Sequence, residues 1–236
     1  MTMFRFTSLF LLATLFFACG GSDAQTPPDA AATTPTPTPT GELRLNEKGR
    51  VPYSAELTFA DGPFAGTHQL VRTKENRGII SLQAARQERI DKFPYLEGKS
   101  GLSALSLTTA DGSFGIANLS RYFTGAPAVG ELAGFASPRP VNGEIKCGAM
   151  QLHTDDAPGV IRHVYVTFLD CGPLTVTGFG DEWKKSSIRP SRTRPMAGRL
   201  TGRVLIEDVN TTEKTRAEHE TTMTLTFVGG HIEATE

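Results

Sequence analysis

The chain has 236 residues, of which 39% are hydrophobic, 8% aromatic and 21% charged, and its formal net charge at pH 7 is −1. The balance of 24 basic and 25 acidic residues gives no electrostatic reason to expect a nucleic acid as the partner. The chain contains three cysteines, Cys19, Cys147 and Cys171. An odd number of cysteines leaves at least one whose role must be explained separately from a disulfide.

The first 18 residues are typical of a signal peptide. Arg5 gives the start a positive charge, and residues 9–18 contain only Leu, Phe, Ala and one Thr. This apolar run has the length of a secretory core and is shorter than the roughly 20 residues that a membrane-spanning helix needs. We therefore expect residues 1–18 to direct export.

The segment Leu15-Phe16-Phe17-Ala18-Cys19 resembles the lipobox of bacterial lipoproteins, with Ala18 as the small residue before the cysteine. The resemblance implies that Cys19 becomes the first mature residue, carries acyl chains such as palmitate and anchors a folded body to a membrane. Gly20 stands where an Asp would favour the inner membrane, so the resemblance implies the outer membrane. The alternative is ordinary secretion with cleavage near Ala18 and a free thiol at Cys19.

Residues 19–41 are expected to be the lipidated cysteine and a disordered linker. Residues 20–40 include five prolines, two charged residues and no aromatic residue, so they cannot bury enough apolar surface to fold. The Thr/Pro run at 34–40 favours an extended path, and the linker would reach up to about 60 Å. O-glycosylation of this run is the alternative to a bare spacer.

Residues 42–236 are expected to form a single β-rich domain, with two small β units dividing near residue 141 as the alternative. Apolar residues alternate with polar ones in three segments, which predicts strands with one face on a core. The segments contain Ala55, Leu57 and Phe59; Leu174 and Val176; and Met223, Leu225 and Phe227. The predicted fold class is all-β, an antiparallel β-sandwich or a barrel-like body.

Two local patterns add detail to this expectation. Asp111-Gly112 lies between the apolar segments 102–109 and 114–120, which predicts a hairpin because both residue types tolerate positive φ. Residues 82–93 carry apolar side chains near helical spacing and end before Pro94. That spacing predicts one helix.

Residues 144–171 are predicted to form a hairpin that turns at residues 158–160. In an antiparallel register with this turn, Cys147 lies opposite Cys171 and the two can form a disulfide. The same register places apolar residues on one face. These residues are Met150, Leu152, Val164, Val166 and Phe168.

The opposite face of that hairpin holds the candidate metal ligands His153, Asp155 and His163. The predicted register places His153 opposite Tyr165 and Asp155 opposite His163. Two imidazoles and a carboxylate are ligand types that zinc uses, with one position left for water. An ordinary solvated or partner-facing sheet surface has the same composition and is the favoured interpretation. No cofactor is expected.

Residues 184–203 contain seven basic residues and no acidic one, and we expect a long loop between strands there. Arginine suits phosphate and carboxylate groups, and neighbouring Trp183 could stack on a sugar ring. The possible ligand-binding residues are Trp183, Lys184, Lys185, Arg189, Arg192 and Arg194. The alternatives are a solvated loop balanced by acidic residues at 207–220, and a Trp183 that serves as a core or loop anchor.

Three classes of function remain compatible with the sequence. The favoured one is a membrane-anchored envelope lipoprotein that acts as a non-catalytic binding or structural module, with an envelope glycan, lipopolysaccharide or a protein as partner. The second is a metal-dependent hydrolase that uses His153, Asp155 and His163. The third is a lipid carrier, if the strands form a closed barrel. No residue is assigned a catalytic role, and enzymatic activity is disfavoured.

Overall fold

The computed structural model describes residues 53–72, 78–138, 147–178, 184–185 and 191–235. The predicted signal peptide, the lipidation site Cys19 and the linker lie outside these residues, as do Trp183 and Arg189. Within the described part of the chain, no helix is long and apolar enough to span a membrane.

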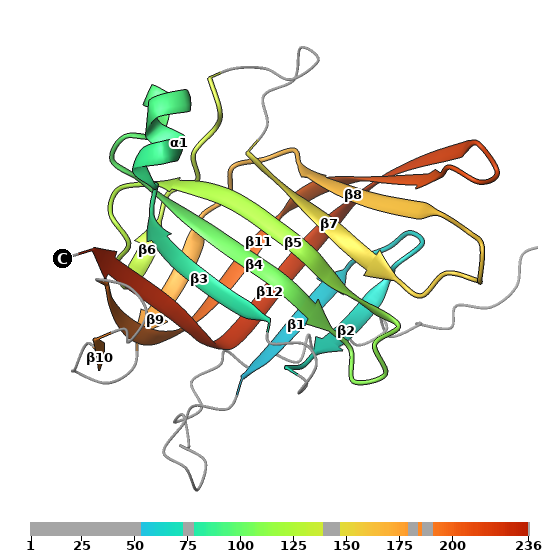
Figure 1. Ribbon diagram of the computed structural model, residues 1–236, viewed down its shortest axis with the longest axis horizontal. Helices are drawn as coiled ribbons and strands as arrows, with labels where there is room; N and C mark the ends of the chain where they lie inside the picture. The colour runs from blue at the N-terminus through green and yellow to red at the C-terminus, as the bar shows by residue number, and fades with distance from the viewer. Residues whose placement is uncertain (1–52, 73–77, 139–146, 179–183, 186–190, 236) are drawn as a thin grey trace, which may run out of the picture. The chain divides into compact units, whose positions relative to one another are not determined.

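The described residues form twelve strands, one short α-helix and one 3-10 turn (Figure 1). The first five strands are β1 (Ser54–Phe59), β2 (Gly66–Leu70), β3 (Ile79–Ala84), β4 (Lys99–Thr108) and β5 (Phe114–Thr124). They are followed by β6 (Gly130–Leu132), β7 (Gly148–Thr154), β8 (Arg162–Phe168), β9 (Leu174–Gly178), β10 (Lys184–Lys185), β11 (Ser191–Asn210) and β12 (Thr215–Thr235). Helix α1 (Gln87–Lys92) and turn η1 (Pro94–Leu96) connect β3 to β4.

All twelve strands belong to one sheet, in the order β2-β1-β12-β3-β4-β5-β7-β8-β11-β9-β6, with β10 paired to β11. The long strands β11 and β12 also pair with each other, so the run β3-β4-β5-β7-β8 is attached to this hairpin at both ends. In Figure 1, β3, β4, β5 and β7 cross in front of it. The order still ends at β2 and β6, so the sheet keeps edge strands.

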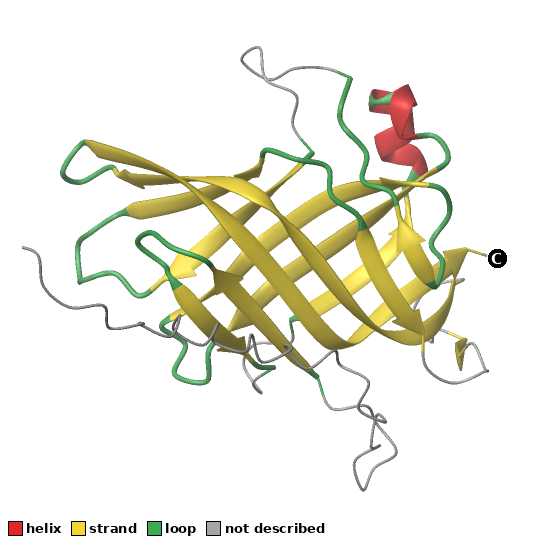
Figure 2. Cartoon of the chain, turned by 180° about the vertical axis from the view of Figure 1, so that it is seen from behind, coloured by secondary structure: helices red, strands yellow, loops and turns green. Residues whose placement is uncertain are grey.

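The all-β prediction is confirmed: all strands belong to one mixed sheet rather than to the two layers of a sandwich, which was one of the two predicted architectures. Strands β12 and β3 pair in parallel, and the other pairings are antiparallel. Strands account for most of the structure in Figure 2. Strands β5 and β7, on either side of residue 141, pair directly and contribute buried residues to the same hydrophobic cluster.

The predicted alternation matches the burial of the side chains. Ala55, Leu57 and Phe59 of β1 are buried, and the polar residues between them are not. The same holds for Leu174 and Val176 in β9 and for Met223, Leu225 and Phe227 in β12. These side chains belong to one core cluster that draws on most of the strands. The period of two therefore identified the core face of each segment correctly.

The hairpin between β4 and β5 is confirmed, but its turn differs from the expected one. Gly112 has a φ of 78° and donates to the Thr109 carbonyl at 3.0 Å. Asp111 does not adopt a positive φ; its carboxylate instead accepts hydrogen bonds from Thr109 Oγ1 and from the Ser113 amide. These bonds lower the pKa of Asp111 to about 2, the bond from Thr109 contributing most.

The helix predicted over residues 82–93 is mostly wrong. Its first residues belong to strand β3, where Ile80 and Leu82 are buried. Only Gln87–Lys92 are helical, and none of them is buried. Pairing of β3 with β4 over six residues gives the backbone partners that override the local helical spacing.

Candidate functional site

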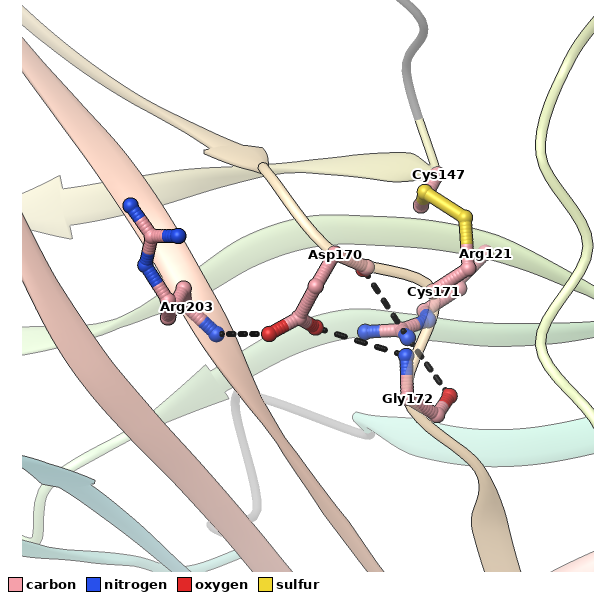
Figure 3. The surroundings of a disulfide bond; sticks show 6 residues. All are labelled: Arg121, Cys147, Asp170, Cys171, Gly172 and Arg203. Carbon is pink, nitrogen blue, oxygen red and sulfur yellow. Dashed lines mark hydrogen bonds between the residues drawn. A yellow bond between two sulfur atoms is a disulfide. The ribbon is translucent and has the colours of Figure 1, made fainter.

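Cys147 and Cys171 form the predicted disulfide, with their Cα atoms 5.2 Å apart. Cys147 immediately precedes β7, and Cys171 lies in the segment that connects β8 to β9. Figure 3 shows the bridge beside the side chain of Arg121, which comes from β5. The disulfide therefore joins the start of the β7–β8 hairpin to the loop that follows it.

Arg121 is completely buried, and it is the largest fully buried side chain among the described residues. Its Nη2 donates to the carbonyl oxygens of Gly172 at 2.7 Å and of Asp170 at 3.3 Å. Its guanidinium carbon lies 4.5 Å from the centre of the Phe168 ring and 5.6 Å from that of Phe123, within cation–π range. The guanidinium thus holds the loop on either side of Cys171.

Burial lowers the pKa of Arg121 to about 10, and the negative charge of Asp170 opposes this shift. The Asp170 carboxylate accepts from the backbone amides of Arg203 at 2.8 Å and of Gly172 at 3.3 Å. Figure 3 shows the side chain of Asp170 extending from this loop toward Arg203 of strand β11. Among the described residues, Nε and Nη1 of Arg121 are buried without a hydrogen-bond partner. The hydrogen bonds of Nη2 stabilise the loop, whereas the two unpaired nitrogens add to the free-energy cost of burying the charge.

The predicted register of the β7–β8 hairpin is wrong by two residues. The observed pairs are Gln151 with Tyr165 and Leu152 with Val164, whereas the prediction placed His153 opposite Tyr165. The turn itself is where we expected it, because the Val160 amide donates to the Ala157 carbonyl at 3.0 Å and Gly159 has a φ of 87°. A shift of two residues keeps every side chain on its face, so the predicted apolar face is still buried.

This correction removes the predicted contacts among the candidate metal ligands. His153 lies opposite Gly115 of β5, and the Asp155 amide donates to the Ser113 carbonyl at 2.7 Å. The ring of His163 lies 6.1 Å from that of Tyr165 on its own strand. In the described ranges, no three His, Cys, Asp or Glu residues are grouped so that they could hold a metal ion.

The basic segment is not the single long loop that we expected. Lys184 and Lys185 form β10 and pair with Thr193 and Arg192 of β11. The arginines from residue 192 to residue 203 lie in β11, which pairs along its length with β12. Arg203 Nη2 contacts Glu220 Oε2 at 3.0 Å, so one of these cations is balanced by the acidic stretch at 207–220. Strand pairing supplies the backbone hydrogen bonds that the Ser/Pro-rich sequence did not indicate.

The outer face of β3, β4, β5, β7 and β8 carries two aligned rows of uncharged side chains, which we call the uncharged face. Antiparallel pairing from strand to strand places the members of each row side by side. The first row is Ile79, Leu105, Asn118, Gln151 and Tyr165, and the second row is Ser81, Ser103, Ser120, Ala149 and Thr167. None of these ten outward positions is an Asp, Glu, Lys or Arg.

The first row carries the larger side chains, whereas the second consists of small ones and is buried at both of its ends. Leu105 is 59% exposed, Tyr165 43% and Ile79 41%, and these are three of the five exposed large hydrophobic residues among those described. Asn118 Nδ2 donates to Gln151 Oε1 at 3.1 Å in the middle of the row. In the second row Ser81 and Thr167 are each 6% exposed, and the hydroxyls of Ser81 and Ser103 are 3.0 Å apart.

Charge returns where the uncharged face ends. The first row continues onto Glu207 of β11 and Glu218 of β12, and the second onto Leu205 and Glu220. Arg216 Nη2 contacts both Glu207 and Glu218. The two kinds of surface therefore meet at the border between β8 and β11. The uncharged face was not predicted from the sequence, because its residues become neighbours only when the register of five strands is known.

No protein-family model, no curated protein and no solved structure matches this chain.

Proposed function

We propose that this chain is a lipid-anchored protein of the bacterial cell envelope whose β body serves as a non-catalytic binding module. In this proposal Cys19 carries the lipid, and the residues up to 41 separate the body from the membrane. Gly20 after the cysteine favours the outer membrane, by resemblance to bacterial lipoproteins.

The observation that carries the proposal is the pairing of Cys147 with Cys171. Because the chain has three cysteines, this pairing leaves Cys19 alone, directly after Ala18 at the end of the apolar run. Structural disulfides persist in oxidising compartments such as the bacterial periplasm. The disulfide in the body and the lipobox-like segment at the N-terminus therefore support export independently.

A binding role is supported by the uncharged face. Three of its side chains, Ile79, Leu105 and Tyr165, are large, hydrophobic and exposed, and exposed apolar surface is one mark of interaction sites. The aligned amides of Asn118 and Gln151 add polar groups that can give such a surface specificity. The surface is built on strands, and paired strands set the spacing of its side chains more precisely than a loop would.

The proposal is tested by phase partition of the full chain expressed in a bacterium with lipoprotein processing. The wild-type protein should enter the detergent phase, and the Cys19→Ala variant should remain in the aqueous phase because its acyl chains are missing. Ser22→Ala, three residues further on, is the matched control and should behave as wild type. Equal membrane association of Cys19→Ala and wild type would refute the lipid anchor.

A further inference from the structure

We propose that the uncharged face binds a neutral, N-acetylated glycan chain that lies across the strands along the row from Ile79 to Tyr165. This inference rests on the binding role proposed above and names the chemistry of the ligand. It differs from the sequence-based expectation that Trp183 and the basic residues 184–194 bind an acidic glycan or lipopolysaccharide.

The absence of charge from this face argues for a neutral ligand. Charged residues make up 21% of the chain, yet ten adjacent outward positions on five strands carry none. A phosphorylated or acidic ligand would require arginine or lysine at its site, and a basic one would require carboxylates. Glu207 and Glu218 border the row at its β11 end, and both are paired with Arg216, so this border offers no unpaired cation to an anionic chain.

The polar groups of the face match a ligand with both hydrogen-bond donors and acceptors. The bond from Asn118 Nδ2 to Gln151 Oε1 orients both amides. Among the described residues, no hydrogen bond engages Asn118 Oδ1 or Gln151 Nε2, so one acceptor and one donor are left for a ligand. The hydroxyls of Ser103 and Ser120 lie in the neighbouring row. Sugar hydroxyls and acetamido groups offer complementary partners to all of these.

The apolar groups are placed where a sugar chain presents apolar surface. Tyr165 stands at one end of the row with an exposed ring, and an aromatic face suits the C–H surface of a sugar ring. Leu105 and Ile79 stand at the other end, three and four strands away, and can cover acetamido methyl groups. Adjacent strands are about 4.8 Å apart, so the row is roughly 19 Å long. This length suits several linked sugars rather than one.

The test measures binding of the detergent-solubilised, full-length processed protein to soluble oligomers of N-acetylglucosamine by calorimetry. Tyr165→Ala and Gln151→Ala should each weaken binding about tenfold, a change typical of losing one good aromatic or hydrogen-bond contact. Ile161→Ala is the matched control, because Ile161 is 57% exposed but lies outside the row, and it should bind as wild type. Affinity should not change with salt, because no charges take part.

Three results would overturn the inference. The first is no binding of the oligomers, or equal binding by wild type, Tyr165→Ala and Gln151→Ala. The second is binding of lipopolysaccharide alone that weakens with salt, which would point to the basic residues. The third is concentration-dependent dimerisation that Tyr165→Ala abolishes, which would make a second copy of the chain the occupant. Each of them leaves the lipid anchor intact, because the partition experiment tests the anchor separately.

Discussion

Replacing Arg121 by methionine should destabilise the protein less than replacing it by lysine. Methionine removes the charge and the hydrogen bonds but fills much of the space of the buried side chain. Lysine keeps the charge but lacks the planar fork that holds the carbonyls of Asp170 and Gly172. The comparison separates the contribution of the hydrogen bonds from the cost of burying the charge.

The magnitudes follow from the contacts of the guanidinium. Its two bonds to carbonyls, at 2.7 and 3.3 Å, together contribute about 3 kcal/mol when the longer one is counted at the low end. The contacts with Phe168 and Phe123 add about 1 kcal/mol. Against this, a pKa lowered from 12.5 to about 10 corresponds to about 3 kcal/mol against the charged form.

Arg121→Met should therefore lose only about 1–2 kcal/mol, since the lost contacts are largely offset by the charge no longer being buried. Arg121→Lys should lose about 3 kcal/mol, because the desolvation cost stays while most of the bonds and the ring contacts disappear. Both losses of unfolding free energy are measured by urea unfolding of the disulfide-bonded proteins, monitored by circular dichroism. The comparison holds when the m-values of the variants equal that of the wild type. A lysine variant as stable as wild type, with a methionine variant more than about 4 kcal/mol less stable, would refute this reasoning.

Three further predictions concern stability. Replacing both Cys147 and Cys171 by alanine should cost about 3 kcal/mol, because the bridge spans a sequence separation of 24 residues, and urea unfolding should show this loss while circular dichroism shows unchanged β content. Gly134→Ala should prevent normal folding, since the added Cβ would lie 2.1 Å from the Cys171 carbonyl oxygen; a soluble variant with wild-type stability would contradict the packing there. Burial lowers the pKa of His231, with the nearby charge of Glu233 opposing and that of Arg72 adding to the shift, so the unfolded chain binds its proton more readily. The free energy of unfolding should therefore be highest above pH 6.5 and fall as the pH drops below it, and His231→Asn should show a smaller fall.

The core of this fold was predictable from the sequence because alternation is a local signal. The side chains of Leu57, Leu225 and Val176 repeat with a period of two within short segments, and each is buried as expected. The turn at Pro158 and Gly159 was predictable for the same reason, since Pro and Gly favour particular turn dihedrals within a few residues. The disulfide followed from the count of cysteines and this turn.

Register and long-range pairing were not predictable in this way. The β7–β8 hairpin differs from the prediction by two residues, and alternation cannot detect an even shift because every side chain stays on its face. The disulfide tolerates the shift because Cys171 lies beyond the end of β8. Residues 82–84 belong to a strand because β4 supplies their backbone hydrogen-bond partners. The local sequence of this segment cannot predict that pairing.

The two features of greatest interest also depend on tertiary structure. Arg121 occupies an inward position between Leu119 and Phe123, where alternation predicts an apolar residue and a charge would ordinarily argue against burial. Its partners come from residues 49 and 51 positions later in the chain. The uncharged face likewise exists only once five strands are in register.

The most direct test of the proposed function is the intact mass of the mature protein isolated from bacterial membranes. The proposal predicts a chain that begins at Cys19, carries the added mass of its acyl chains, and contains one disulfide between Cys147 and Cys171. A chain that retains residues 1–18, or one that is cleaved near Ala18 and carries no lipid, would contradict the central claim that this β body is anchored to the envelope through Cys19.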